Sequence, residues 1–415
     1  MKVLPGLFPA TLLGLLLLSV RVATAVEIKH VATTPLIPLY EKVGDQAVLN
    51  CEMQFENTGL PLGLVSWKVR KSYGDGTHQD VQGQRVKFWQ NLVLRTINKT
   101  DTCGGGLAKN ATCMTDTFAG YYADNQWVPG QERIPKNSHI IFFLAITDFP
   151  ANKPPHNLTV TLKFEQQYTN AMKELSVTLV PKMYQLKNTY IFPTGWGDSV
   201  NLPAGQEWFI GHSHEVGTPH RRAHNWWDGK ANPLLFNQRY AHDLLIRDAK
   251  GETHRPFPEP GIRAVEHYYA WGQKVYAMSS GTVTAVYKNA IDGWYAGAPR
   301  PAGEPGAGNY VIIDHGDGES SGYAHLQKGS IPFKKGDLVK VGDVIGKIGQ
   351  TGASSEPHLH FALAPKNIYE RHDGLPIYFL NIELKRDKVD GAFQKWMTGI
   401  PSGSAIKVKP ISFKF

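Results

Sequence analysis

The sequence predicts an all-β protein built from two units, and three observations support this prediction. Short apolar or alternating runs recur along the chain between turn residues, which is the pattern of short antiparallel strands. The 41 Gly and 27 Pro, with only 19% charged residues, argue against a coiled coil, a disordered chain or a polytopic membrane protein. At 415 residues the chain is long enough for one or two complete cores.

The first 25 residues have the three parts of a secretory signal peptide. Lys2 supplies a short basic region, residues 12–20 an apolar stretch, and residues 23–25 (Ala-Thr-Ala) a cleavage site. A membrane anchor needs about 20 uninterrupted apolar residues, whereas Pro9 and Arg21 interrupt this run. We therefore expect removal of residues 1–25 and a mature protein that is secreted or periplasmic, without stable membrane insertion.

Residues 26–195 are predicted to form a β-sandwich. Runs such as 139–144 and 175–180 are apolar or alternating, and Gly, Asn, Asp and Pro turns separate them. Regularly spaced short strands of this kind are typical of an immunoglobulin-like sandwich. This half of the chain shows no catalytic constellation. With only 3 cysteines in the chain, hydrophobic burial rather than a disulfide framework must hold the fold.

Residues 196–385 form the second predicted unit, which is also β-structure. Glycines at 336, 342, 346 and 349 stand among Val, Leu and Ile and fit tight turns between short antiparallel strands. Residues 289–308 break the pattern with a Pro-, Gly- and Ala-rich stretch, which indicates an inserted loop that could lie beside a site. Residues 386–415 are a C-terminal extension whose alternating end could add an edge strand.

Histidine is unevenly distributed, because 12 of the 16 lie after position 210. The sharpest local signal is Pro357-His358-Leu359-His360-Phe361. In a strand, residues i and i+2 point to the same face, so both imidazoles can reach one site. Such a pair suits a zinc centre in which one histidine binds the metal and the other handles protons. The plain alternative is an exposed pair of histidines on a strand without a metal.

Two more segments favour a site. His325 ends a strand-like run, and Asp243 lies within the apolar run 238–245. A carboxylate in an apolar strand is costly unless it is paired or metal-bound. The alternative for Asp243 is a salt bridge to Arg239 or Arg247.

Several motifs follow one another in order between residues 275 and 363. They are Ala277-x-x-x-Gly281-x-Val283, Gly308-Asn309-Tyr310-Val311-Ile312-Ile313-Asp314-His315-Gly316, Tyr323-Ala324-His325-Leu326, Gly336-Asp337-x-Val339-x-x-Gly342, Gly349-x-Thr351-Gly352-x-Ser354 and Pro357-His358-Leu359-His360-Phe361. Together they resemble the lysostaphin/LytM-type zinc metallopeptidase family. The resemblance implies that residues 196–385 form a compact antiparallel β LytM-type peptidase domain. It also implies one zinc in a groove and hydrolysis of peptide bonds in peptidoglycan cross-links.

Carried over by this resemblance, Asp243 and His360 are zinc ligands, and His358 and His325 are catalytic residues beside the zinc-bound water. Family members place the first ligand histidine four residues before the aspartate. In this sequence that position is Arg239, a cation that cannot ligate zinc.

Two explanations for Arg239 remain open. One is that another histidine supplies the ligand; His220 is favoured because a branch of the family has a similar His-Arg-Arg-Ala stretch, with His224 and His242 as alternatives. His242 would face the opposite side of its strand from Asp243. The other explanation is a degenerate, zinc-free domain that binds the cell wall or activates an enzyme.

The expected mechanism is hydrolysis by a zinc-activated water. His358 would act as general base or stabilise the developing oxyanion, and His325 would orient the tetrahedral intermediate. A cluster of His212, His214 and His224 with two tryptophans could line the substrate groove or simply pack. The net charge of +8 suits an anionic wall polymer, and the chain has no Lys/Arg run of five or more that would favour nucleic acid.

Overall fold

The computed structural model describes sixteen stretches of the chain. They are residues 26–43, 46–84, 92–98, 117–123, 126–129, 138–150, 152–196, 201–213, 220, 225–227, 230–232, 238–258, 261–366, 373–385, 403 and 405–408. Within them nearly all regular structure is β-strand, with a short 3-10 turn at Val265–His267, so the all-β prediction is confirmed. In the same residues no helix is long and apolar enough to cross a membrane. The predicted signal peptide lies outside them.

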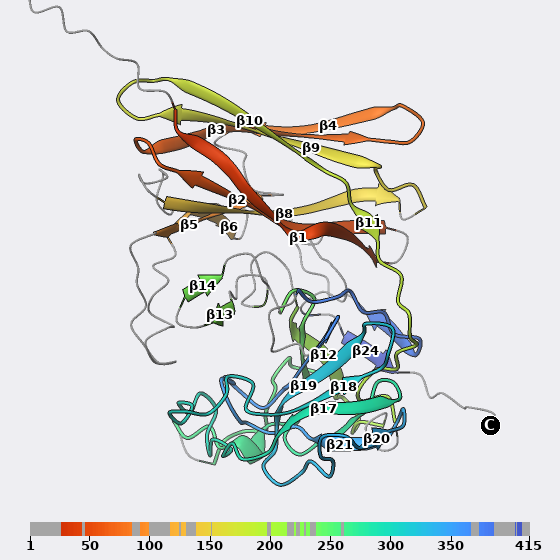
Figure 1. The fold of residues 1–415 in the computed structure, drawn as a ribbon. Helices are drawn as coiled ribbons and strands as arrows, with labels where there is room; N and C mark the ends of the chain where they lie inside the picture. Colours follow the sequence, from red (N-terminus) through yellow and green to blue (C-terminus); the bar gives the residue numbers. More distant parts are fainter. Residues whose placement is uncertain are drawn as a thin grey trace, which may run out of the picture.

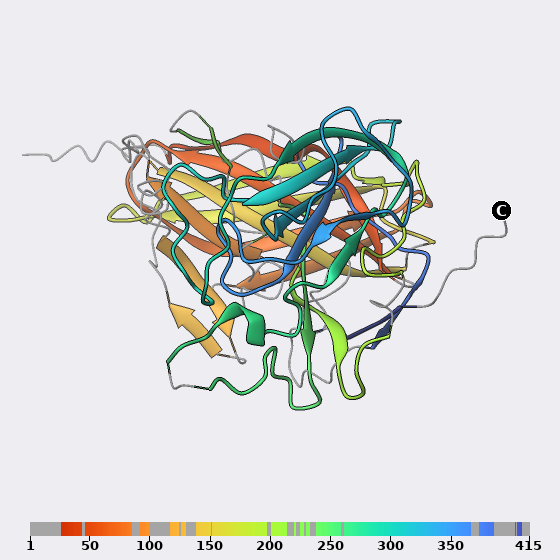
Figure 2. The same ribbon diagram turned by 90° about the horizontal axis from the view of Figure 1, so that it is seen from below.

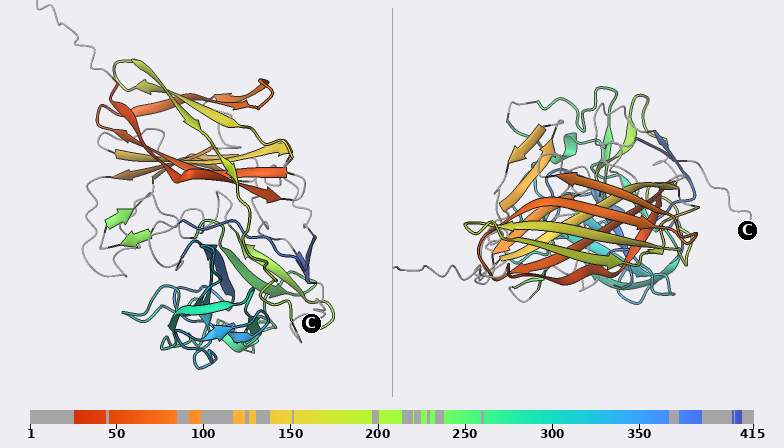
Figure 3. Two further views of the ribbon diagram at one scale, coloured as in Figure 1. Left: turned by 45° about the vertical axis from the view of Figure 1, so that its right-hand side comes forward. Right: turned by 90° about the horizontal axis from the view of Figure 1, so that it is seen from above.

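Two sheets make up the N-terminal unit and lie one above the other (Figure 1; Figure 3, right, looks down on them). The seven-stranded sheet has the order β11-β1-β2-β8-β5-β6-β7. Its strands are Ile28–Val43 (β1), Gln46–Asn57 (β2), Leu92–Asn98 (β5), Thr117–Ala123 (β6), Gln126–Pro129 (β7), Ser138–Pro150 (β8) and Lys182–Met183 (β11). The four-stranded sheet, in the order β10-β9-β3-β4, contains Leu62–Ser72 (β3), His78–Gln84 (β4), Asn157–Gln166 (β9) and Met172–Leu179 (β10).

One hydrophobic core joins the two N-terminal sheets. Alternate residues of β9, from Leu158 to Phe164, are buried and share this core with Met53 and Phe55 of β2 and Trp67 of β3. Alternation with one buried face is what two packed antiparallel sheets require. The immunoglobulin-like character of this sandwich stays a prediction.

The second unit is built on a nine-stranded sheet with the order β20-β17-β18-β19-β22-β15-β12-β24-β23. Its strands are Glu207–His212 (β12), His242–Arg247 (β15), Gly281–Tyr287 (β17), Asn309–Asp314 (β18), Ser320–Leu326 (β19), Leu338–Val339 (β20), Leu359–Ala364 (β22), Ile382–Lys385 (β23) and Ala405–Val408 (β24). Two small two-stranded sheets accompany it: Asn225–Trp227 (β13) with Lys230–Asn232 (β14), and Lys274–Tyr276 (β16) with Val344–Lys347 (β21). Figure 2 shows this unit from below, in front of the sandwich.

The C-terminal strand β24 differs from the expected edge strand. It lies between β12 and β23, so β23 takes the edge of the sheet. Ile406 and Val408 pack into the core of the second unit, whereas Lys407 between them is exposed.

The connection between the two units is tied to the second one by Glu319, which lies between β18 and β19. Its carboxylate accepts hydrogen bonds from the hydroxyls of Tyr184 (2.7 Å) and Tyr190 (2.9 Å), from the backbone N–H groups of Lys187 (2.8 Å) and Asn188 (3.0 Å), and from the Asn188 side-chain amide (3.0 Å). The first core includes Met183, whereas Tyr190 already belongs to the second. The predicted domain limits at 195 and 385 stay a prediction.

Candidate metal centre

Strand register brings the predicted site residues together. In the sheet β22 lies between β15 and β19, and His360 stands opposite Asp243 on one side and Ala324 on the other. His325 follows Ala324 at the end of β19, and His358 directly precedes β22. Segments far apart in sequence therefore converge because neighbouring strands align these positions.

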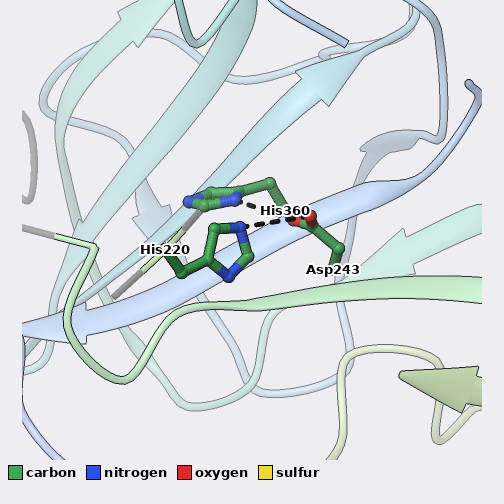
Figure 4. A group of neighbouring side chains, drawn as sticks. All are labelled: His220, Asp243 and His360. Atoms are coloured by element: carbon green, nitrogen blue, oxygen red, sulfur yellow. Dashed lines mark hydrogen bonds and ion pairs between the residues drawn. The ribbon is translucent and has the colours of Figure 1, made fainter. Parts of the chain in front are cut away.

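Three buried residues form a candidate metal centre: His220, Asp243 and His360 (Figure 4). Nε2 of His220 lies 3.1 Å from Oδ2 of Asp243, and Nδ1 of His360 lies 2.9 Å from Oδ1 of Asp243. One ligand atom from each residue falls within 4.8 Å of the others. The residues are only 4%, 8% and 6% exposed, so the convergence is shielded from solvent.

The surroundings of these residues fit a metal ion. Nδ1 of His220 lies 3.1 Å from the carbonyl oxygen of Ala241, which fixes the tautomer with the proton on Nδ1 and leaves the lone pair of Nε2 directed at Asp243. A hydrogen bond from the second ring nitrogen to a carbonyl is a common support of metal-binding histidines. Two imidazole nitrogens and one carboxylate oxygen make a three-ligand set that leaves a further position open.

His325 and His358 stand side by side next to this group. Their ring centroids are 4.7 Å apart, and Nε2 of His358 lies 3.4 Å from Oδ1 of Asp243. Nδ1 of His325 donates to the carbonyl of Thr351 (2.7 Å), and Nδ1 of His358 donates to the carbonyl of Glu356 (2.7 Å). In both rings Nε2 is therefore the nitrogen left for chemistry.

The backbone of His325 adopts the left-handed conformation, with φ at +59°. Such a conformation costs a non-glycine residue about 1–3 kcal/mol and persists where surrounding contacts fix it. Those contacts come from the predicted inserted loop and the motif that contains Thr351: the N–H of His325 donates to the carbonyl of Ala307 (2.9 Å), and the N–H of Gly349 donates to the carbonyl of His325 (3.0 Å). The loop thus lies beside the site, as its composition predicted.

The four titratable neighbours differ in how they hold protons. Burial would raise the pKa of Asp243, but His220 and His358 outweigh it and hold the pKa well below its usual value. Burial, with His358 and His360 nearby, keeps the pKa of His325 well below its usual range. Burial lowers the pKa of His360, and the contact with Asp243 offsets this shift only in part. For His358, burial also acts to lower the pKa, but the charge of Asp243 outweighs burial and raises it.

The structure also bears on the other partners considered for Asp243, namely two arginines as salt-bridge partners and two histidines as alternative ligands. Neither alternative salt bridge of Asp243 forms, because Arg239 pairs with Asp373 (3.1 Å) and Arg247 pairs with Glu207 (2.7 Å). His242 stacks on Phe361 in the core at 5.3 Å, on the face of the strand away from Asp243. His224 and His214 lie outside the described residues.

Two supports of the site were not assigned from the sequence. Oγ of Ser354 lies 3.1 Å from Nδ1 of His358 and donates to the carbonyl of Glu356 (2.8 Å). His212, considered only as a groove residue, places Nδ1 3.4 Å from Oδ2 of Asp243. Ser354 and Thr351 belong to the motif Gly349-x-Thr351-Gly352-x-Ser354, which marks these positions in the sequence without assigning them a role.

Comparisons with known proteins agree with this geometry. Residues 262–371 match the family model described as Peptidase family M23. Peptidoglycan DD-endopeptidase ShyB of Vibrio cholerae is 38% identical over 96 residues, which cover 23% of this chain and 18% of ShyB. Lysostaphin of Staphylococcus staphylolyticus is 35% identical over 117 residues, which cover 27% of this chain and 21% of lysostaphin. The chain thus spans about a fifth of the length of these curated relatives.

Among solved structures, the catalytic domain of lysostaphin from Staphylococcus simulans is 30% identical, with a TM-score of 0.17 over 27% of this chain and 77% of that chain. A zinc containing peptidase from Vibrio cholerae is 14% identical, with a TM-score of 0.25 over 85% of this chain and 86% of that chain. The family match contains His325, His358 and His360, while Asp243 and His220 lie upstream of it. Asp243 joins the group through its pairing with β22, and His220 joins it from outside the strands of the sheet. Residues 262–371 therefore form a domain of the peptidase M23 family.

Proposed function

We propose that this protein is an extracytoplasmic zinc metalloendopeptidase that hydrolyses peptide bonds in peptidoglycan cross-links. The observation that carries the proposal is the meeting of His220 Nε2, His360 Nδ1 and the Asp243 carboxylate in a buried group. Two imidazoles and a carboxylate with an open position are the ligand set of catalytic zinc. When bound there, zinc would supply a Lewis acid that activates water and polarises the scissile carbonyl.

His325 and His358 would divide the proton transfers. His325 is neutral near pH 7 and its Nδ1–H is already bonded to Thr351, so its Nε2 can accept a proton from water. His358 faces the site with Nε2, so it can act as general base or donate a hydrogen bond to the developing oxyanion.

The substrate is proposed from the relatives and from charge. ShyB, which is 38% identical to this chain over 96 residues, bears the name peptidoglycan DD-endopeptidase. The net charge of +8 favours approach to an anionic wall polymer. The apolar N-terminal segment of residues 1–25 supports export to the compartment where that polymer lies.

The test uses the purified full chain, its zinc content and its action on purified peptidoglycan. Wild-type protein should hold one zinc per chain and release peptides with new amino termini, detectable by mass spectrometry. His360→Ala should lose both properties, whereas His78→Ala, on β4 of the sandwich, should keep both. Wild-type protein without stoichiometric zinc, or unchanged wall digestion by His360→Ala, would refute the proposal and favour the zinc-free, wall-binding alternative.

A further inference from the structure

His212 contacts the buried carboxylate from outside the candidate ligand group. Its Nδ1 lies 3.4 Å from Oδ2 of Asp243, and its ring centroid lies 6.4 Å from that of His220. His212 is not part of the group whose ligand atoms all fall within 4.8 Å of one another. Its side chain is 52% exposed, against 11% for Asp243, so it stands between the buried centre and solvent.

A β-bulge places His212 on this face of the sheet. The ladder between β12 and β15 pairs Ile210 with Leu244 but then pairs His212 with Asp243, so Gly211 is the extra residue. Without the bulge, Gly211 would stand opposite Asp243, and His212 would turn to the other face, where Ile210 and Leu244 belong to the core.

Gly211 leaves room at this bulge for the side chain of Leu245, which would have to move to admit a larger residue. A Cβ atom added to Gly211 would lie 2.4 Å from Cδ1 of Leu245, far closer than real carbon atoms approach. The strand therefore carries two linked features, a residue without a side chain and the register shift beside it. Bulges next to active sites commonly re-aim a side chain, and the side chain re-aimed here is that of His212.

Each oxygen of the Asp243 carboxylate has two histidine neighbours. Oδ1 lies near His360 and His358, and Oδ2 lies near His220 (3.1 Å) and His212 (3.4 Å). His220 and His360 are the proposed ligands, so their facing nitrogens must present lone pairs when metal is bound. A carboxylate oxygen left off the metal then needs a donor from elsewhere, since a buried oxygen without one costs about 1–3 kcal/mol.

We propose that His212 is a positioning residue that donates a hydrogen bond from Nδ1 to Oδ2 of Asp243 and thereby orients this carboxylate for metal binding. The inference rests on the proposed zinc function. It assigns His212 no part in the chemical step and no place among the ligands. Its effect should appear in metal affinity, because outer partners of metal ligands typically change that affinity about 10–100-fold.

The experiment measures the zinc dissociation constant of the full chain by competition with a chromogenic chelator. His212→Ala should raise the constant about 10–100-fold and leave the melting temperature of the metal-free protein unchanged, since the side chain is half exposed. His212→Asn should recover most of the affinity, because an amide N–H can take the place of Nδ1–H. His78→Ala is the matched control and should bind zinc like wild type.

Three outcomes separate the possibilities. Weakened zinc binding by His212→Ala with recovery by His212→Asn supports the positioning role. Unchanged affinity in His212→Ala, or equal loss in both variants, overturns that role while the zinc function of the wild type stands. Wild-type protein that binds no zinc overturns the proposed function and the role of His212 together.

Discussion

Nε2 of His220 lies 3.1 Å from Oδ2 of Asp243, although the two residues are on separate segments and Arg239 stands in the sequence position where the family places a ligand histidine. In the proposed metal centre, the nitrogen ligand therefore comes from a separate segment and not from the strand position at 239. Arg239 itself is fully buried and bonded to Asp373, so it has become part of the scaffold.

Replacement of His220 should distinguish it from the nearby His242. His220→Ala removes one of three ligands, so we expect a loss of zinc affinity larger than the 10–100-fold typical of an outer partner. His242→Ala should lower the melting temperature, because it removes a ring stacked on Phe361 in the core, and should keep zinc at wild-type stoichiometry. Atomic absorption on dialysed protein measures the zinc that each variant retains, and thermal unfolding measures the melting temperature. Zinc retained by His220→Ala but lost by His242→Ala would reverse the assignment.

Removal of the Ser354 hydroxyl should slow catalysis without loss of metal. Oγ of Ser354 supports Nδ1 of His358, which keeps the carbonyl of Glu356 as its other partner. We expect Ser354→Ala to reduce kcat about tenfold, equivalent to about 1.4 kcal/mol, with an unchanged zinc content. Steady-state digestion of a cross-linked muropeptide gives kcat; a fall in KM or zinc content with kcat preserved would contradict this role.

Zinc should stabilise the protein through its proposed ligands His220, Asp243 and His360. A ligand at 100 times its dissociation constant adds about 2.7 kcal/mol to the free energy of unfolding when it binds only the folded state. Chelator-treated wild type should therefore melt several degrees lower than zinc-loaded wild type. His360→Ala should show no such difference, and an equal zinc-dependent shift in this variant would place the metal elsewhere.

Glu319 should make stability depend on acid pH. Burial would raise its pKa, but the hydrogen bonds led by Tyr184 outweigh burial and lower it below the usual value of 4.5. Because the folded-state pKa is the lower one, the stabilisation is complete above the unfolded pKa and is lost as the pH falls through the folded pKa.

Glu319→Gln should consequently be less stable than wild type at pH 7, by about 1.5–3 kcal/mol for loss of hydrogen bonds to a charge. The difference between the two proteins should shrink as the pH falls below about 4.5. Urea unfolding at several pH values measures it. A difference that stays constant from pH 7 to pH 3 would show that the charge of Glu319 contributes nothing.

The sequence predicted the parts of the site that depend on local geometry. The two-residue period of a strand was sufficient to place His358 and His360 together, and the cost of a carboxylate in an apolar run drew attention to Asp243. The all-β class is likewise predicted by local patterns, namely turn residues and the alternation of apolar and polar side chains between them.

The remaining contacts depend on tertiary structure. The role of His212 follows from a bulge, and a one-residue register shift leaves no trace in a hydrophobic pattern that contains Gly211. Glu319 binds backbone N–H groups more than 130 positions away, and backbone donors have no sequence signature. The alternative interpretation of Asp243 as a salt-bridge partner is excluded by pairing in the folded chain, where Arg239 contacts Asp373 and Arg247 contacts Glu207.

The place of β24 between β12 and β23 sets an order for biosynthesis. A ribosome must have released residue 408 before β12 has a neighbour on both sides, although β15, β19 and β22 can pair long before. A chain terminated ahead of residue 405 would leave β12, with its bulge and His212, as an unpaired edge. Such a truncated product would hold every proposed ligand and still expose a strand that invites association with other chains.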